Sequence, residues 1–589
     1  MAKYSILVLD VRDGALPELD KLGRDKNKAL SDGYVIYIYR GTGSGKVYIG
    51  QTKNFKSRHD QHYNGKEEKF NTADFDQVMV IFSSYFDRSA LDDVESQLIT
   101  YFTADRSENT GQTIAFDSKE VINRTGGNKV SAYLNREKIA SEVILPLWEE
   151  KLYPMGWVKT KTLDMLRTKA LVKYSPIKVL TAEQSALIDE IFQNPDKNYV
   201  INGDAGTGKT VLLTHLVARL LQDREDVRIG VIIQPNWEST GADIFKVFGM
   251  SSTRLTITTS TKFIKANEKY DVIIVDEAHK LSRRYGKQHP SFNEVYDIDG
   301  FADCTSHLEI LRRMGSQVIL LYDVLQAIRP ANITREMFQN LTDGYERRFL
   351  TTQFRIQTPE GKSYTSDDYI NGIKYLLYKD TGLLDTGYTR FDPDFSRDLF
   401  RDNTPDAYFG YFTERPLHQM IDWIEEDNNF NPEHVNRVLA GLVEPWKQSD
   451  GKDAGVKHWH EDDISRRWNS TQENWINSRD EDAREQIGSV FAVQGIDLNK
   501  VGVLIGNDLA VDENGRLYAE PANFHNTNGT FTQEEMEMQE NRDEFTLFVL
   551  NIYYVLLTRG IDGIRLGFWK NDAFRVYMEK TLDICLQGN

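Results

Sequence analysis

Short apolar runs alternate with polar and glycine-rich stretches along the chain, which indicates a mixed α/β protein. The segments "YVIYIY" and "KVYIG" near the N-terminus are rich in β-branched and aromatic residues and predict two strands. A further strand is expected at "QVMVIFSSY", and an amphipathic helix is expected at "SALDDVESQLITYF". Farther along, three buried strands are expected at "NYVI", "YDVIIV" and "VILLY".

The stretch "GTGSGK" between the first two strands has the residue types of a phosphate-binding loop. Such a loop follows the pattern G-x-x-x-x-G-K-[ST], in which the final hydroxyl reaches Mg²⁺. Only three residues separate Gly41 from Gly45, and Val47 follows Lys46. We therefore predict that residues 41–46 form a hairpin turn and bind no nucleotide.

The complete pattern occurs at residues 203–210, "GDAGTGKT", between an expected strand and an apolar helix. Backbone N–H groups at the helix N-terminus would cradle phosphates there, in a loop that contains Gly203, Gly206 and Gly208. Lys209 would reach the β and γ phosphates, and Thr210 would hold Mg²⁺. These residues predict a nucleotide site with ATP and Mg²⁺ as cofactors.

Acidic residues follow the next buried strand, in "YDVIIVDEAHKL". Asp276 would position Mg²⁺, and Glu277 would polarise the attacking water. That order resembles the core of superfamily 1 and 2 helicases. Superfamily 1 is favoured because "VILLYDVLQ" places Gln326 where a γ-phosphate sensor stands, while "LTTQFR" and "YYVLLTRG" place Arg355 and Arg559 in arginine-finger positions. The alternative is that either arginine is a plain surface residue.

Together with "SVFAVQGIDL", which contains Gln494 and Gly495, these segments resemble the Schlafen group 3-type DNA/RNA helicase domain over about residues 178 to 570. The segment "LTAEQ" before the phosphate loop leaves two interpretations open. Gln184 could contact the adenine base, or Thr181 and Gln184 could form a capping box for the next helix. Both could hold at once.

A second set of residues surrounds the N-terminal hairpin, where Tyr37 and Tyr48 lie eleven positions apart across the turn. Asn54 could cap a helix that carries Arg58 and His62, which are four residues apart and so share one face. Each has an alternative interpretation, because a strand tyrosine more often serves packing and a lone helical histidine more often lies at the surface.

The next expected helix carries Glu95, and Asn123 follows in "INRTGGN". In this order the residues resemble the GIY-YIG nuclease family over about residues 31 to 130, with "VIY" and "YIG" as its two signature motifs and with Arg58, His62, Glu95 and Asn123 after them. Val35 replaces the opening glycine of the family and adds a Cβ where backbone could approach closely. An intact fold with lost activity is therefore one alternative.

The resemblance implies phosphodiester hydrolysis, which needs an activated water, a cation for the developing charge and help for the leaving oxygen. Glu95 is the one acidic residue of the set and is assigned to a Mg²⁺ (or Mn²⁺) ion. Arg58 would stabilise the pentacovalent phosphate, and Tyr37 or Tyr48 would orient or deprotonate the water. A tyrosinate would need positive charge nearby, because free tyrosine has a pKa of about 10. His62 could relay a proton.

Charge distribution bears on the partner. The chain of 589 residues has a formal net charge of −18, which argues weakly against a protein that coats nucleic acid everywhere. Residues 31–70 nevertheless hold seven Lys/Arg against four Asp/Glu (+3), and residues 151–180 hold seven against one (+6). A basic front on an acidic body would place nucleic acid at one region, although ordinary solvated faces explain any single cluster equally well. We expect nucleic acid as the partner, with DNA favoured over RNA.

The length of the apolar runs and the number of cysteines bear on the cellular location of the protein. No apolar run approaches the roughly 18 residues of a membrane span, so no membrane partner is expected. The two cysteines, Cys304 and Cys585, form no metal or redox motif, and their scarcity favours a reducing cytoplasm.

We therefore predict an α/β chain of four parts. Residues 1–130 would form a small α+β GIY-YIG nuclease domain with an N-terminal strand–helix extension, and residues 131–177 a helical basic connector. Residues 178–330 and 331–589 would form two RecA-like parallel-sheet domains of a helicase core, the second with insertions.

The favoured hypothesis is an ATP-dependent nuclease–helicase that moves along or remodels nucleic acid and cuts it with the N-terminal domain. Analogy at the level of fold suggests anti-phage defence, with a phage-encoded trigger or inhibitor, and repair or restriction next. One alternative is an NTP-driven switch that senses a partner or phage component and releases the nuclease without translocation. A binding module with two degenerate sites is disfavoured by the complete phosphate loop.

Overall fold

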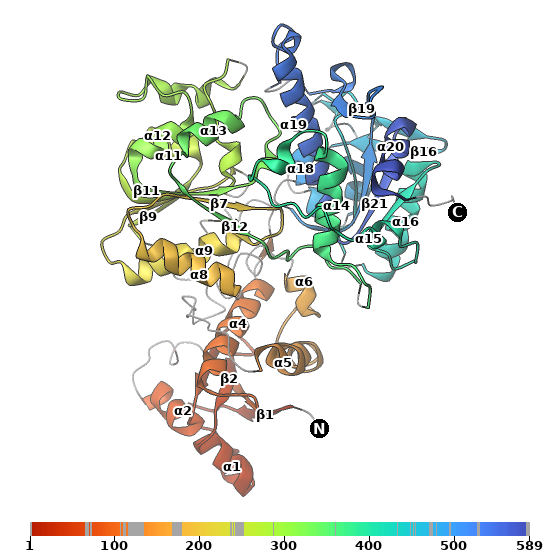
Figure 1. Ribbon diagram of the computed structural model, residues 1–589. Helices are drawn as coiled ribbons and strands as arrows, with labels where there is room; N and C mark the ends of the chain where they lie inside the picture. The colour runs from red at the N-terminus through yellow and green to blue at the C-terminus, as the bar shows by residue number, and fades with distance from the viewer. Residues whose placement is uncertain are drawn as a thin grey trace. The chain divides into compact units, whose positions relative to one another are not determined.

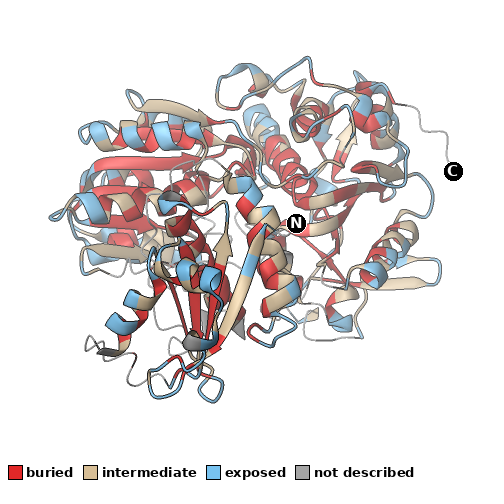
Figure 2. Cartoon of the chain, turned by 90° about the horizontal axis from the view of Figure 1, so that it is seen from below, coloured by how far each residue is buried: buried red, intermediate tan, exposed pale blue. Residues whose placement is uncertain are grey.

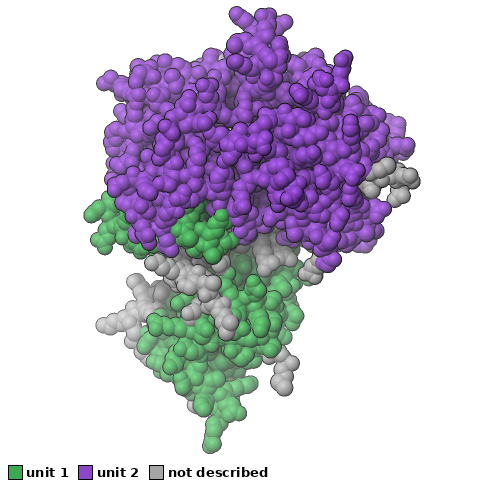
Figure 3. Space-filling view, viewed as in Figure 1, with its two compact units in different colours: residues 1–188, 210–227, 236–255 green, residues 189–209, 228–235, 256–589 purple. Residues whose placement is uncertain are grey.

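A computed structural model describes most of the chain (Figure 1). The described residues are 3–64, 70, 74–106, 108–109, 114–115, 135–167, 180–235, 238, 241, 245, 252–286, 288–359, 361–432, 434–447, 449–450, 453, 455–469, 475–478, 480–493, 496–526 and 530–584. Contacts divide the chain into two compact units (Figure 3). Unit 1 comprises Met1–Ile188, Thr210–Val227 and Asn236–Leu255, and unit 2 comprises Asp189–Lys209, Arg228–Pro235 and Thr256–Asn589.

A four-stranded antiparallel sheet forms the N-terminal part of unit 1, in the order β1-β4-β2-β3. Its strands are β1 (Tyr4–Asp10), β2 (Val35–Arg40), β3 (Val47–Thr52) and β4 (Gln77–Ser83), and the helices are α1 (Arg24–Ser31), α2 (Phe55–Asn64) and α4 (Arg88–Arg106). A short pair, β5 (Glu108–Asn109) and β6 (Ile114–Ala115), follows. The predicted strands, helix and strand–helix extension are all present.

The predicted hairpin turn is confirmed. Arg40 pairs with Val47, so residues 41–46 connect the two strands. The Gly41 N–H donates to the Lys46 carbonyl at 2.9 Å, and Gly45 adopts φ = +69°, a left-handed conformation that favours glycine. The glycines of "GTGSGK" therefore serve a tight turn.

The described part of the expected connector is helical. It contains α5 (Arg136–Ile139), two π-helical segments (Ala140–Ile144 and Leu147–Leu152) and α6 (Leu163–Arg167). The second π-helical segment ends two residues before Pro154, near the predicted break. Trp148 is fully buried and packs edge-on against Phe102 of α4, with ring centroids 5.4 Å apart. Burial of such an aromatic side chain is worth about 2 to 3 kcal/mol, so the connector is anchored to this helix.

Unit 2 contains a six-stranded sheet in the order β12-β7-β11-β10-β8-β9. The strands are β7 (Tyr199–Gly203), β8 (Ile229–Ile232), β9 (Leu255–Thr258), β10 (Tyr270–Val275), β11 (Gly315–Tyr322) and β12 (Glu346–Leu350). The pairs from β12 to β8 are parallel, as expected for a RecA-like sheet. Because β12 extends this sheet to Leu350, the expected boundary at residue 330 falls inside it, and we propose a boundary after β12.

The helices of this part of the chain range from 7 to 15 residues. They are α8 (Ala182–Gln193), α9 (Lys209–Asp223), α11 (Ser260–Ala266), α12 (His307–Met314) and α13 (Arg335–Leu341). α9 directly follows the phosphate loop, as the pattern requires.

A seven-stranded sheet follows in the order β13-β21-β18-β14-β17-β16-β15. Its strands are β13 (Phe409–Phe412), β14 (Arg437–Ala440), β15 (Trp459–Glu461), β16 (Ile464–Trp468), β17 (Gln486–Gly488), β18 (Leu498–Ile505) and β21 (Gly560–Phe568). All its pairs are parallel except β15 with β16. A separate hairpin joins β19 (Leu509–Val511) to β20 (Leu517–Ala519).

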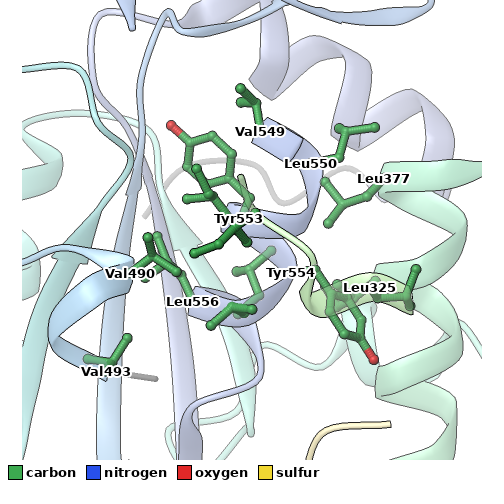
Figure 4. Close-up of a cluster of buried hydrophobic side chains, with 14 of the residues drawn as sticks. Leu325, Leu377, Val490, Val493, Val549, Leu550, Tyr553, Tyr554 and Leu556 are labelled. Carbon is green, nitrogen blue, oxygen red and sulfur yellow. The ribbon is translucent and has the colours of Figure 1, made fainter. Parts of the chain in front are cut away.

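The helices that accompany this sheet are α14 (Ser366–Tyr378), α15 (Asp398–Arg401), α16 (Pro416–Phe430), α17 (Glu481–Arg484), α18 (Val490–Val493), α19 (Gln539–Leu557) and α20 (Asp572–Leu582). Figure 2 shows that buried residues are concentrated in the strands. The second half of α19 is also buried almost throughout. Figure 4 shows why: Tyr553, Tyr554 and Leu556 of α19 lie among apolar side chains of α14, α18 and the turn after β11. This core therefore fixes α19, and with it the residues that follow Leu557.

No helix within the described ranges is both long and apolar enough to cross a membrane.

Candidate functional site

The phosphate loop of unit 2 lies between β7 and α9. Gly206 and Gly208 have φ angles of +86° and +80°, a left-handed backbone that any other residue would strain to adopt. A Cβ on Gly203 would lie 2.5 Å from Thr207 Oγ1. Sterics thus require glycine at all three predicted positions.

The Lys209 ammonium lies over this loop. Its Nζ donates to the carbonyl oxygens of Gly203 at 2.6 Å and Asp204 at 3.0 Å. Asp323 Oδ2 lies 3.7 Å away. The lysine therefore holds its positive charge at the loop, and Thr210 follows it in the first turn of α9.

Asp276 and Glu277 lie directly after β10, where the parallel strands end. Burial, and then the charge of Glu277, raises the pKa of Asp276. Burial would also raise the pKa of Glu277, but Lys280, His279 and Lys209 outweigh it and hold that pKa well below its usual value. Glu277 is therefore ionised.

Glu277 also has an unusual backbone. It adopts φ = +54°, which costs on the order of 1 kcal/mol for a residue with a Cβ. Its Oε2 lies 2.9 Å from His279 Nε2. The backbone conformation of Glu277 and its contact with His279 together restrict the orientation of the carboxylate.

The residues fit a nucleotide with a divalent cation. The loop leads into the N-terminus of α9, where backbone N–H groups favour phosphate, and Lys209 supplies positive charge there. Asp276 Oδ1 is buried and has no hydrogen-bond partner among the described residues, as expected of an oxygen that binds a cation or its water.

Gln326 connects this loop to one of the predicted arginines. Its Nε2 donates to Asp323 Oδ2 at 2.6 Å, and its Oε1 accepts from Arg559 Nη2 at 3.5 Å. Arg559 is 1% exposed, and burial lowers its pKa to about 10, so it stays protonated near neutral pH. The surface interpretation of Arg559 is therefore wrong.

Arg355 lies beside the same loop. Its Nε lies 2.5 Å from Asp497 Oδ1, and its Nη1 donates to the carbonyl of Thr558, the residue before Arg559. The two residues before Arg355 bind the phosphate loop, because Gln353 Nε2 donates to the Ala205 carbonyl at 2.8 Å and the Phe354 N–H to the Gly206 carbonyl at 2.9 Å. Arg355 is thus held near the loop and is no plain surface residue.

The nuclease residues of unit 1 centre on Tyr37. It pairs with Gly50 across the hairpin, and a Cβ on Gly50 would lie 2.4 Å from Tyr37 Oη. The glycine of "YIG" therefore makes room for the phenol. Tyr37 Oη lies 2.9 Å from His62 Nε2, and the rings of Tyr37 and Tyr48 stack with centroids 6.3 Å apart.

His62 is fully buried and stacks on Phe70 with centroids 4.0 Å apart, so it does not lie at the surface. The predicted cap of its helix is present, because the Ser57 N–H donates to Asn54 Oδ1 at 3.0 Å. Val35 is buried at the start of β2 and pairs with Thr52 without a break in register. Its Cβ is therefore accommodated in the sheet.

Burial, and then the nearby Tyr48, raises the pKa of Tyr37 well above its ordinary value, although Arg58 hydrogen-bonds the phenol and lowers it. The phenol therefore keeps its proton near neutral pH. Of the two expected roles, orienting a water fits this environment better than deprotonating it.

Glu95 lies on α4, and its carboxylate accepts from Gln51 Nε2 at 3.1 Å. Burial raises the pKa of Glu95 to about 7, although the Gln51 hydrogen bond and the charge of Arg58 lower it. Arg58 thus lowers the pKa of both Tyr37 and Glu95. Together with His62, which lies against Tyr37, these residues form one environment of four predicted nuclease residues. Asn123 lies outside the described residues.

Comparison with known families finds both of the expected domains. The sequence profile of the GIY-YIG catalytic domain matches residues 33–109, and that of the Schlafen group 3 DNA/RNA helicase domain matches residues 196–569, more than half of the chain. The chain belongs to the Schlafen group 3 helicase family. An uncharacterized protein of Saccharomyces cerevisiae is 25% identical to this Schlafen group 3 chain over 442 residues, which are 68% of this chain and 90% of the yeast protein.

Solved structures of helicases are also similar. The helicase domain of Hef from Pyrococcus furiosus is 10% identical, with a TM-score of 0.29, over 67% of this chain and 96% of that one. The Pif1 helicase of Candida albicans is 13% identical, with a TM-score of 0.26, over 66% and 95%.

Gln184 of this Schlafen-family chain does form the capping box. Its side-chain Oε1 accepts from the Thr181 N–H, and its own N–H donates to Thr181 Oγ1, both at 3.1 Å. The contact with an adenine base stays a prediction. Gln494 and Gly495 lie outside the described residues.

Two residues at the nuclease site were not expected. Gln51 bridges two carboxylates, since its Nε2 also donates to Asp92 Oδ1. Asp92 and Glu95 are three residues apart on α4, so their spacing on a helix was the available signal. Within the described ranges, no group of three or more His, Cys, Asp or Glu residues is arranged to hold a metal.

Proposed function

We propose that the protein is an ATP-dependent nuclease–helicase that moves along or remodels nucleic acid, with DNA favoured over RNA, and cuts it with the GIY-YIG domain. The observation that carries this proposal is the chain of contacts from Lys209 through Asp323 and Gln326 to Arg559. A phosphate-loop lysine, a γ-phosphate sensor and an arginine finger linked in this way form the machinery of a motor.

Bound ATP with its divalent cation would supply the phosphate that is cleaved. Lys209 would neutralise the phosphates, and Asp276 and Thr210 would hold the cation. The ionised Glu277 would orient the attacking water and accept its proton. Arg355 and Arg559 would stabilise charge on the transferred phosphate, an effect worth about 10³-fold or more in rate.

The nuclease chemistry would rest on four residues. Glu95 would hold one divalent cation, and its carboxylate would ionise fully once that cation is bound. Arg58 would stabilise the charge on the phosphate, and the Tyr37–His62 pair would orient the water and relay a proton. Asn123 is proposed from the family order alone.

A group of arginines that stack on aromatic rings, one of them exposed, supports nucleic acid as the partner. The guanidinium of Arg329 lies 4.4 Å from the ring centroid of the exposed Phe491, whereas those of Arg283 and Arg284 lie 4.6 and 4.5 Å from the buried rings of Tyr285 and Tyr296, which hold the two arginines in place. Arg283 Nε also donates to the carbonyl of Pro330, next to Arg329. The arginines would offer charge to phosphates, and the exposed Phe491 with Arg329 would offer a flat face to a base.

The decisive experiment is ATP turnover with single-stranded, duplex and forked DNA and with RNA, together with cleavage of the same substrates. Stimulation by single strands and directional strand displacement would support translocation. ATP turnover that does not change with nucleic acid but rises with a protein partner would instead support the switch mechanism.

For the cellular role we propose anti-phage defence, with repair or restriction as the next alternative. Infection of cells that express the wild type or the Lys209→Ala variant tests this role. Equal phage yield in both would leave repair, which survival after DNA damage then tests.

A further inference from the structure

The phosphate loop contains a carboxylate that its sequence pattern does not require. Asp204 occupies the second position of "GDAGTGKT", between Gly203 and Ala205. A negative charge there would repel the phosphates that the loop is built to bind. The structure therefore has to neutralise Asp204.

Lys374 of α14 does so. Its Nζ donates to Asp204 Oδ2 at 2.7 Å and to the carbonyl of Arg390 at 2.5 Å. The Lys374 side chain is 1% exposed, whereas that of Asp204 is 21% exposed. A lysine so deeply buried is costly unless its charge is paired, so the contact is specific.

Other contacts keep this pair in place. Thr389 Oγ1 lies 3.5 Å from Asp204 Oδ1, on the second oxygen of the carboxylate. Lys209 donates to the backbone carbonyl of Asp204, so the two lysines bind the same residue through different atoms. The side chain of Asp204 is thus engaged by residues 374–390, while its backbone belongs to the loop.

We propose that Lys374 is a positioning residue of the nucleotide site, which neutralises Asp204 and ties the phosphate loop to α14. The inference rests on the proposed function in one respect, that this loop binds a nucleoside triphosphate. It adds a charge pair whose acidic partner the phosphate-loop pattern does not specify and whose lysine lies outside the motifs above. Loss of the lysine alone leaves an uncompensated carboxylate beside the phosphates, whereas loss of both charges does not.

The test is calorimetric titration of the full chain with a non-hydrolysable ATP analogue and Mg²⁺. Lys374→Met keeps the apolar stem and should weaken binding about tenfold or more, because Asp204 then repels the phosphates. Asp204→Asn should bind at least as tightly as the wild type, since Lys374 remains. The double variant should return to within about threefold of the wild type.

A structural role alone would weaken binding in both single variants. Thermal unfolding without nucleotide identifies that case, and the double variant guards against a misfolded Lys374→Met, because replacing both charges of a buried pair is often neutral for stability. Lys379→Met, just after α14, is the matched control and should bind normally, since Lys379 lies over the Tyr577 ring.

Equal affinity in wild type and Lys374→Met, or a double variant as weak as Lys374→Met, would overturn the proposal. A wild type that binds no nucleotide would instead refute the proposed function.

Discussion

Arg559, on the turn after α19, donates through Nη2 to the side-chain oxygen of Gln326, on the turn after β11, at 3.5 Å. The two residues are 233 positions apart in the sequence. Gln326 follows β11, which pairs with β7, the strand before the phosphate loop, whereas Arg559 directly precedes β21. If Gln326 senses the γ-phosphate as proposed, this hydrogen bond would link that sensor directly to the residue that precedes β21 of the second sheet.

The first prediction concerns this arginine. Arg559→Ala should retain binding of an ATP analogue but lose turnover by about 10³-fold or more, because the charge that stabilises the transferred phosphate is gone. Steady-state turnover and calorimetry measure the two effects. Arg559→Lys keeps the charge without the fork and should lose less; near-wild-type turnover in the alanine variant would remove Arg559 from the site.

The second prediction separates the two activities. Glu95→Ala should abolish cleavage, because the proposed cation ligand is lost and with it several kcal/mol of charge stabilisation. ATP turnover stimulated by nucleic acid should stay intact, which also serves as the control for folding. Retained cleavage of a long duplex would show that Glu95 is not essential.

Coupling of the units gives a third prediction. Lys209→Ala should leave the chemistry at Glu95 intact but reduce cleavage of long or structured substrates, because translocation would no longer feed the nuclease. Cleavage of a long duplex with and without ATP is the measurement. Wild-type cleavage of every substrate in the presence of ATP would mean that the two units are merely tethered.

The fourth prediction concerns the glycine opposite Tyr37. Gly50→Ala places a Cβ 2.4 Å from Tyr37 Oη, so it should displace the phenol, destabilise the sheet by about 1 to 3 kcal/mol and impair cleavage. Gly43→Ala in the neighbouring turn meets no atom within 4 Å and is the matched control. Thermal unfolding and cleavage assays should separate the two; equal behaviour would show that the contact at Gly50 relaxes freely.

The last prediction concerns Arg329. Arg329→Ala should weaken the affinity for single-stranded DNA and reduce the salt dependence of binding by about one counterion. The reason is that the variant lacks the guanidinium that stacks on Phe491 and would contact one phosphate. Arg516→Ala, an exposed arginine between β19 and β20, should leave both unchanged. Fluorescence anisotropy over a range of salt concentrations measures this, and an unchanged slope for Arg329→Ala would place the nucleic acid elsewhere.

The sequence by itself determined the local elements and the motifs they carry. Strand–loop–helix order around residues 203–210, the hairpin turn at residues 41–46 and the cap at Asn54 were all predictable, because each depends on neighbours along the chain. The expected fusion of the two families was predictable for the same reason and is confirmed.

Only the tertiary structure decided which environment each side chain meets. Burial in the folded domain, which the order of residues along the chain does not reveal, keeps the proton on Tyr37 and raises the pKa of Glu95 to about 7. Packing between distant segments adds β12 to the first sheet and places Gln51 between two carboxylates. It also pairs Lys374 with Asp204, which are 170 positions apart. Desolvation and charge pairing depend on every neighbour in space, and a linear pattern records only those that are near in the chain.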